Sequence, residues 1–312
     1  MTITKLLAAA SCIALAGCAS YAPQSASTSQ IALPADGGAG TAKEQVEADV
    51  AFELLGADYI SALTEMDPIY ATALGEHAYD DLLPDVSADG RKRRRQIDHG
   101  FLAALRTISF DQLSRANQVD YMLLRNELEY NNWSHDVEQQ WAWNPQSYHW
   151  LASGALYGLI KREFAPFEER FADITARMEA LPELLAMARD QIDVPRVPKI
   201  HAETVAKQNA GIMSVVTGLI DPEVEKSGLD RARYDAAKAA LQTALDEHQA
   251  WLDDVVVPGA QGDFRLGAEK YQQKMRFALH TDMSVAQLKD RAETAYAETR
   301  AQMFEIARQI EP

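Results

Sequence analysis

The chain has 312 residues, of which 46 are Asp or Glu and 30 are Lys or Arg, so its formal net charge at pH 7 is −16. A surface this acidic repels polyanions, and nucleic acid is therefore excluded as an expected partner. The basic run at residues 91–95 is interpreted as a solvated helix start that faces acidic neighbours. Both cysteines, Cys12 and Cys18, lie near the N-terminus, so no disulfide is expected in the rest of the chain.

Residues 1–17 have the layout of a lipoprotein signal peptide. Lys5 supplies a positive start, and the apolar stretch that follows is about a dozen residues long, too short to span a bilayer. It ends in Leu-Ala-Gly-Cys at residues 15–18, which resembles the bacterial lipobox. In that motif the cysteine thiol is acylated, with palmitate as a typical chain, so Cys18 is the predicted lipidation site. The alternative is an ordinary cleaved signal with a chance cysteine.

Acylation would attach the protein to a membrane, because each buried methylene of an acyl chain contributes about 0.8 kcal/mol. The residue after the cysteine is Ala19 rather than an aspartate, which favours the outer membrane by the usual sorting pattern. We therefore expect an outer-membrane lipoprotein that faces the periplasm. Residues 18–41 are rich in Ser, Ala, Gly, Thr and Pro and nearly uncharged, which predicts a flexible tether.

From residue 42 to residue 312 the apolar residues recur at helical spacing almost throughout, and no sustained alternating or β-branched run appears. The predicted fold class is all-α, as one large multi-helix domain. Helices are predicted at 42–67, 68–74, 97–108, 113–128, 164–191, 200–219, 229–256, 265–280 and 284–310, with a loop over 80–90 and a break near Asn117.

Three capping boxes are predicted, in which a Ser or Thr and a Glu or Gln three residues later bond each other's backbone. They pair Thr41 with Glu44, Ser109 with Gln112, and Ser284 with Gln287. The helical spacing of apolar residues predicts the buried face of the first helix, which is Val46, Val50, Leu54, Ala57 and Ile60.

No catalytic or metal-ligating residue is predicted from the motifs. No two of the seven histidines are four residues apart and none precedes a glutamate, so the His-Glu-x-x-His zinc helix is absent from the sequence. A nucleophile elbow, a phosphate-binding glycine loop and a dinucleotide fingerprint are absent as well. The adjacent carboxylates at 80–81, 168–169 and 253–254 are interpreted as solvated surface, because neighbouring residues point to different faces of a helix.

One aromatic segment stands out, because three of the five tryptophans lie within ten residues. The first interpretation is packing between helices, since aromatic rings bury large areas. The second is one wall of a substrate cleft, because Asn144-Pro145 breaks the segment and irregular backbone often carries sites. His149 alone is more typical of a structural histidine than of a metal ligand. The candidate cleft-wall residues are Trp141, Trp143, Asn144, Tyr148, His149 and Trp150.

Several short motifs in order resemble the N-terminal half of a large bacterial family, catalogued as domain of unknown function 885. The resemblance covers about residues 45–311. The motifs are Asp67-Pro68-x-x-Ala71-Thr72-x-Leu74-Gly75-x-His77-x-Tyr79-Asp80, then Trp143-Asn144-Pro145-x-x-Tyr148, Arg177-Met178-x-Ala180-Leu181-Pro182-x-Leu184-Leu185, and Phe264-Arg265-Leu266-Gly267-x-Glu269-x-Tyr271.

The resemblance implies a helical, often lipid-anchored protein nearly twice this length. Members are grouped with zinc metallopeptidases because their C-terminal half carries a His-Glu-x-x-x-Gly-His type helix. This chain stops at Pro312 before such a motif, so we expect a fragment that forms one half of a helical peptidase-like cleft. Zinc is implied for the full-length family, and no cofactor is expected in this chain.

Two functions remain open at this point. The first is the non-catalytic, N-terminal half of a zinc-dependent peptidase, lipid-anchored and facing the periplasm, with peptides as substrates and no activity alone. The second is a lipid-anchored helical scaffold or binding protein without chemistry, or the product of a truncated gene. The membrane, through the anchor, is a partner in both.

Overall fold

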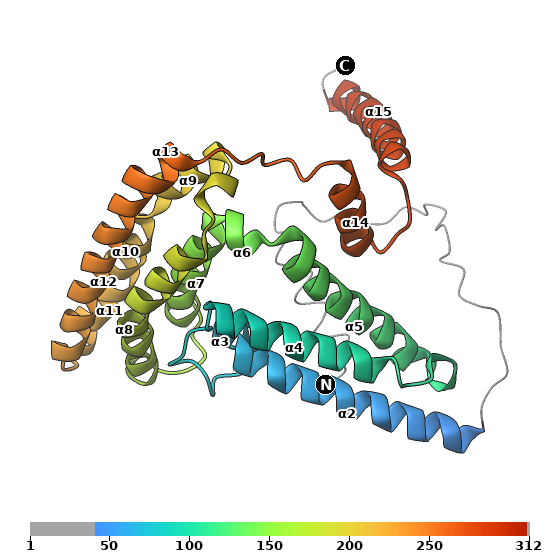
Figure 1. Cartoon of the computed structure of the whole chain (residues 1–312), viewed down its shortest axis with the longest axis horizontal. Coiled ribbons are helices and arrows are strands. Elements are labelled where there is room, and N and C mark those ends of the chain that lie inside the picture. The colour runs from blue at the N-terminus through green and yellow to red at the C-terminus, as the bar shows by residue number, and fades with distance from the viewer. Residues whose placement is uncertain (1–40, 311–312) are drawn as a thin grey trace. The chain divides into compact units, whose positions relative to one another are not determined.

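The computed structural model describes residues 41–310, and within that range the chain is helical apart from loops and an isolated bridge between Pro198 and Gly262 (Figure 1). The all-α prediction is confirmed. The predicted signal peptide and the tether up to residue 40 lie outside the described residues, and so does Cys18. The chain divides into two units, one that ends at Phe264 and one that begins at Arg265.

The first unit begins with three long helices that pack side by side: α2 (Ala42–Met66), α4 (Ala88–Leu105) and α5 (Arg115–Trp133) (Figure 1). The short helix α3 (Pro68–Leu74) ends at Gly75, whose positive φ of 89° suits a residue without a side chain. The core of this bundle consists of Phe52, Tyr59, Leu102, Leu105, Leu113, Tyr121, Leu124 and Leu128.

The predicted buried face of α2 is wrong. Val46, Val50 and Leu54 are 62%, 50% and 62% exposed, whereas Phe52 and Tyr59 are almost completely buried. Both stripes have helical spacing, but a buried aromatic ring removes more apolar area from water than a valine does. The aromatic stripe therefore faces α4 and α5, and the aliphatic stripe is left on the surface.

Two of the predicted capping boxes are confirmed and one is wrong. Thr41 and Glu44 bond each other's backbone at the start of α2, and Ser284 and Gln287 do the same before α15. Ser109 instead precedes a single 3-10 turn, η1 (Phe110–Gln112), and makes no capping hydrogen bond. The cap of α5 is Ser114, so the predicted break near residue 117 does not occur.

The rest of the first unit packs around α8 (Phe167–Gln191), which contacts α7 (Pro145–Lys161) and α12 (Ala232–Trp251) along its length. The single helix predicted over 200–219 is divided into α9 (Lys199–Gln208), α10 (Gly211–Val215) and the π-helical turn η4 (Val216–Ile220), before α11 (Asp221–Ser227). The remaining elements are α6 (Gln140–Trp143), the π-helical turns η2 (Ser134–Glu138) and η5 (Leu252–Val256), the 3-10 turn η3 (Val194–Arg196) and α13 (Val257–Gly259).

A buried ion pair ties the loop after α3 to α8. Arg177 has no exposed surface, and its Nη2 lies 3.7 Å from Oδ1 of Asp80, which is 2% exposed. Asp80 also accepts a hydrogen bond of 2.5 Å from the hydroxyl of Thr72 and lies 2.7 Å from Nδ1 of His77. The interpretation of Asp80 as solvated surface is therefore wrong, because its cation lies far along the sequence on another helix.

The second unit contains α14 (Ala268–Leu279) and α15 (Val285–Ile310). The Gln272 side chain joins them, because its amide donates to the carbonyl of Met283 and accepts from the backbone N–H of Val285. No residue of α15 is buried, and its exposed apolar side chains are Val285, Tyr296, Met303, Phe304, Ile306 and Ile310.

Candidate functional site

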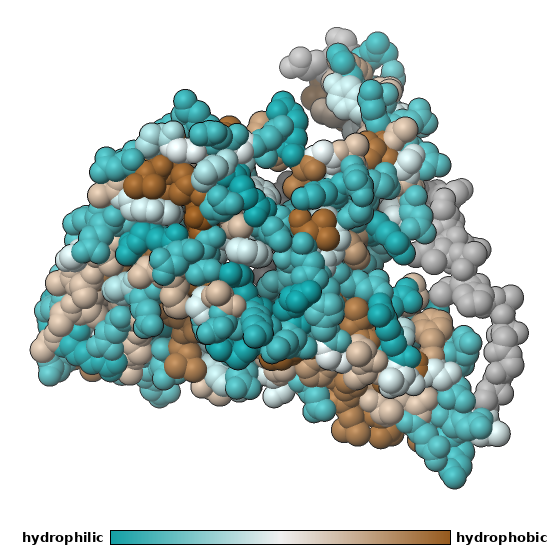
Figure 2. All heavy atoms as spheres, viewed as in Figure 1, coloured by the Kyte–Doolittle hydropathy of each residue, from teal (hydrophilic) through white to brown (hydrophobic). Residues whose placement is uncertain are grey.

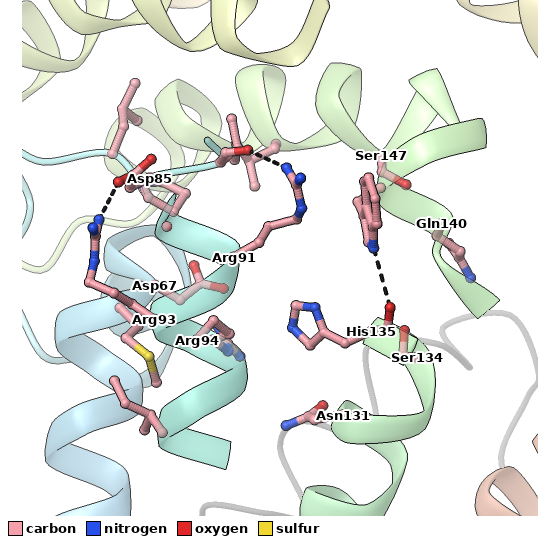
Figure 3. Close-up of a pocket in the computed structure, with 18 of the residues that line it drawn as sticks. Asp67, Asp85, Arg91, Arg93, Arg94, Asn131, Ser134, His135, Gln140 and Ser147 are labelled. Carbon is pink, nitrogen blue, oxygen red and sulfur yellow. Dashed lines mark hydrogen bonds and ion pairs between the residues drawn. The ribbon is translucent and has the colours of Figure 1, made fainter. Parts of the chain in front are cut away.

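A pocket of about 600 Å³ opens within the first unit, where the end of α2, the loop before α4, and α4 itself meet the segment from α5 to α7 (Figure 3). The segment includes the π-helical turn η2, and π-helical turns inside helices are frequent at functional sites. Here η2 places Ser134 and His135 on the pocket wall. The residues that line the pocket include Arg91, Arg94, His135, Trp141, Tyr148 and Leu151.

The basic wall of the pocket comes from the first turns of α4. Helical geometry puts residues three or four apart on one face, so Arg91 and Arg94 both reach the pocket. Arg94 lies 3.7 Å from the buried carboxylate of Asp98, and Arg93 forms an ion pair with Asp85 of the preceding loop (Figure 3). These two arginines are thus neutralised by carboxylates of the same segment.

Arg91 is held differently, by neutral groups. Its Nη1 donates to the carbonyl of Val86 at 3.2 Å and to the side-chain oxygen of Gln191. Its guanidinium carbon lies 4.0 Å from the ring centroid of Trp141, which is a cation–π contact. No carboxylate of residues 41–310 lies within ion-pair distance of this guanidinium.

The aromatic wall is fixed by hydrogen bonds to backbone carbonyls. The indole N–H of Trp141 donates to the carbonyl of His135 at 3.4 Å, and the hydroxyl of Tyr148 donates to the carbonyl of Trp141 at 2.8 Å. Burial raises the pKa of Tyr148 to about 12. Tyr148 is therefore a neutral phenol near pH 7, which suits shaping the pocket and does not suit proton transfer.

His135 lies beside the basic wall. Figure 3 shows its ring and the amide of Asn131 pointing from the α5 side of the pocket toward α4. Burial lowers the pKa of His135, and the nearby Arg94 lowers it further, while Asp136 acts in the opposite direction. The imidazole is thus neutral near pH 7, in a local field that is positive.

Two carboxylates of the pocket already have hydrogen-bond or ion-pair partners within the protein. Asp85 accepts hydrogen bonds from Ser87, including its backbone N–H, and pairs with Arg93, and together these lower its pKa against the opposing effect of burial. Asp67 caps α3, because its carboxylate accepts the N–H of Tyr70 at 3.0 Å. Asp85 is thus held by partners that favour its charged form, and the Asp67 carboxylate is engaged in capping α3.

The structure places only some of the predicted cleft-wall residues in the pocket. Trp141 and Tyr148 line the pocket, but the other four do not. Trp143 donates to the carbonyl of Glu138 at 2.8 Å and stacks on His201, and Asn144 is buried at the start of α7. Trp150 is 59% exposed. Packing therefore explains Trp143 and Asn144, and the cleft-wall interpretation remains for Trp141 and Tyr148.

His149 lies outside the pocket, close to His248. Its Nδ1 is buried and has no hydrogen-bond partner in the part of the chain that the structure describes, and burial lowers its pKa. Among residues 41–310 no group of three or more His, Cys, Asp or Glu side chains is arranged to hold a metal ion. The residues described here thus do not fit the zinc that the family resemblance implies. That the chain as a whole supplies no metal ligand stays a prediction.

Sequence reasoning missed Arg91 and His135. The basic run was interpreted as solvated surface, which holds for Arg93 and Arg95, since Asp85 and Asp136 face them. The signal that separates Arg91 is its spacing to Arg94 and Asp98, which puts all three on the inner face of α4. No sequence pattern predicted that His135 would face the pocket, because the π-helical turn η2 sets the direction of its side chain.

The family described as "Bacterial protein of unknown function (DUF885)" matches residues 68–312. The chain belongs to this family. Membership confirms the resemblance on which the sequence motifs converge, and it covers the helices from α3 onward, including all of the pocket except the part that α2 supplies. No curated protein matches the chain.

One solved structure that the chain resembles is a candidate lipoprotein of unknown function from Shewanella oneidensis, with a TM-score of 0.71 and 29% identical residues. The match covers 82% of this chain and 47% of that one, so this chain spans about half the length of that neighbour. Within residues 41–310 no helix combines the length and the apolar character needed to cross a membrane.

Proposed function

We propose that this protein holds peptides in the pocket between α2, α4 and α5–α7, as the non-catalytic, N-terminal half of a zinc-dependent peptidase of the cell envelope. The observation that carries the proposal is the pocket itself. Its volume of about 600 Å³ falls within the range of roughly 300–1,000 Å³ that is usual for ligand sites, and it combines an aromatic wall with a few polar groups.

Peptides suit this lining better than other ligand classes. Trp141, Tyr148 and Leu151 offer apolar surface to a side chain, and Asn131 and Gln140 offer amides that can bond a peptide backbone. We assign no catalytic role to the pocket: burial and then Arg94 lower the pKa of His135, and Tyr148 is a neutral phenol bonded to a backbone carbonyl. Bond cleavage would belong to the zinc-binding half that the family resemblance implies.

The test is a calorimetric titration of the purified, detergent-solubilised protein with short synthetic peptides that end in an apolar residue. We expect Trp141→Ala to weaken binding by about tenfold, because loss of an aromatic anchor commonly costs 1 kcal/mol or more. The matched control is Trp150→Ala, which removes an exposed tryptophan of α7 outside the pocket. Absence of peptide binding to the parent protein, or equal losses in both variants, would contradict the proposal.

The second candidate is a lipid-anchored scaffold without chemistry, and the exposed stripe of α2 favours it. Val46, Val50 and Leu54 lie along one face of this helix, and Figure 2 shows apolar surface over its middle. Exposed apolar patches mark interaction sites when they are contiguous. The peptide titration separates the two functions, because a scaffold that acts through α2 has no reason to bind free peptides in the pocket.

We also propose that Cys18 is acylated and anchors the protein to the outer membrane, on the periplasmic side. The lipobox spacing supports this, as does the likeness to a candidate lipoprotein. In cells labelled with a radioactive fatty acid, the parent protein should carry label and Cys18→Ser should lose it, because no other side chain there forms the thioether. Cys12→Ser is the matched control and should keep the label. Label retained in Cys18→Ser, or absent from the parent, would overturn the assignment.

A further inference from the structure

Arg91 is a pocket cation whose charge is not balanced within the described residues. The other three arginines of the basic run are paired, Arg93 with Asp85, Arg94 with Asp98 and Arg95 with Asp136. Arg91 has only two neutral oxygens and the face of Trp141. A guanidinium that is partly withdrawn from water is costly unless an anion pairs with it. In a chain of net charge −16, the unpaired Arg91 is therefore a candidate anion-binding site.

The unused hydrogen-bond donors of Arg91 lie on one edge of the guanidinium. Both of its hydrogen bonds come from Nη1, so within residues 41–310 neither Nε nor Nη2 donates to the protein. These two nitrogens form the side of the fork that binds a carboxylate with two parallel N–H···O bonds. The cation–π contact with Trp141 and the two bonds of Nη1 hold the side chain in place, so little entropy is lost when an anion binds.

We infer that Arg91 binds the C-terminal carboxylate of a peptide, while the aromatic wall contacts the side chain of its last residue. The inference rests on the proposed function, in that the ligand is the peptide assigned to this pocket. The new element is the recognition of the C-terminal end of the peptide, which determines the peptides that are selected. A protein that binds a free C-terminal carboxylate favours short peptides and chain ends over internal segments of folded proteins.

The remaining charges of the pocket favour a carboxylate over a phosphate. Glu65, Asp67 and Asp85 also line the pocket, and they repel a dianion more strongly than a monoanion. The arginine that remains unpaired, Arg91, matches one negative charge. Trp141 beside it, and Leu151 elsewhere on the pocket wall, offer an apolar surface, which a phosphate cannot use.

His135 supplies an independent readout of the bound charge. Its pKa lies below the ordinary value because of burial and then Arg94, Arg91 and Arg95, with Asp136 opposing them. A carboxylate on Arg91 adds a negative charge to this field and so raises the pKa of His135. The shift is measurable by NMR titration of the imidazole with and without ligand, and a merely structural arginine would not produce it.

The experiment compares one apolar peptide in two forms, with a free C-terminal carboxylate and with a C-terminal amide. For the parent protein we expect amidation to weaken binding by at least about tenfold, because it removes a charge-assisted bidentate pair. Arg91→Gln should bind both forms equally and weakly. The matched control is Arg95→Gln, which removes an exposed arginine of the same helix outside the pocket and should keep the preference.

The outcomes separate this inference from the function on which it rests. Tight binding of both peptide forms to the parent would overturn the carboxylate assignment and leave peptide binding in place, whereas binding of neither form would overturn both. Stronger competition by inorganic phosphate than by acetate would also overturn it, in favour of a phosphate site. A thermal melt equal to that of the parent shows that Arg91→Gln is folded. If Arg91→Gln melts at a lower temperature than the parent, the test is the His135 pKa of the parent. A rise in this pKa on binding of the carboxylate peptide supports the inference, and no rise contradicts it.

Discussion

Replacing Arg177 with methionine is expected to lower the free energy of unfolding by about 3–5 kcal/mol, because it removes one partner of a buried ion pair and leaves the Asp80 carboxylate with only the Thr72 hydroxyl and the His77 ring. The guanidinium donates to the carbonyls of Leu82, Ala155 and Pro68 at 3.0, 2.9 and 3.1 Å and to the hydroxyl of Thr72 at 2.9 Å. It thereby ties α3, the following loop and α7 to α8.

Urea denaturation followed by circular dichroism measures this loss. The matched control is Arg233→Met, which breaks a surface pair with Glu179 and should lower the midpoint far less, since solvent screens exposed pairs. Adding Asp80→Asn to Arg177→Met should recover part of the stability, because the buried carboxylate then no longer carries an unbalanced charge. Equal midpoints for Arg177→Met and Arg233→Met would show that the buried pair does not hold these elements together.

The helices could be predicted from the sequence because their signals are local. A three- and four-residue spacing of apolar residues, Thr41 before α2 and Ser284 before α15 all act within one turn of the chain. The errors occur where local signals compete. The α2 helix has two apolar stripes, and only the packing of Tyr59 and Phe52 against α4 and α5 decides which one is buried.

The pocket could be predicted only in part, because its residues come together through tertiary structure. The aromatic segment gave Trp141 and Tyr148, since three tryptophans so close together are a compositional signal. The spacing of Arg91 to Arg94 and Asp98 indicates the inner face of α4, but its partners Trp141 and Gln191 lie far along the sequence. Asp80 was misinterpreted for the same reason, because Arg177, the cation that makes its burial tolerable, belongs to another helix.

Acidification is expected to destabilise the protein through His248 on α12. The imidazole is 6% exposed, its Nδ1 has no hydrogen-bond partner in the described residues, and its ring lies 5.2 Å from that of Trp251. Burial, followed by the positive charge of Arg189 and by His149, lowers the pKa of His248 from 6.5 to about 4. The folded protein therefore takes up this proton at a lower pH than the unfolded chain does.

The sign of the effect follows from that difference in proton uptake. Above the unfolded pKa of 6.5 the histidine is neutral in both states, and its contribution to stability is complete. As the pH falls toward 4 the unfolded chain binds the proton first, so stability is lost across this window, by about 3–4 kcal/mol in total at about 1.4 kcal/mol per pKa unit.

Urea midpoints of the parent and of His248→Phe, measured at several pH values between about 7.5 and 4, test this expectation. Phenylalanine keeps a ring against Trp251 and cannot titrate, so the variant should lose less stability on acidification than the parent. Asp98 and Glu127 act in the opposite direction, because burial raises the pKa of both carboxyls, and the comparison of the two proteins cancels their contribution. His99→Phe, at a half-exposed site on α4, is the matched control and should follow the parent. Parallel pH curves for the parent and His248→Phe would show that this histidine does not set the acid sensitivity of the fold.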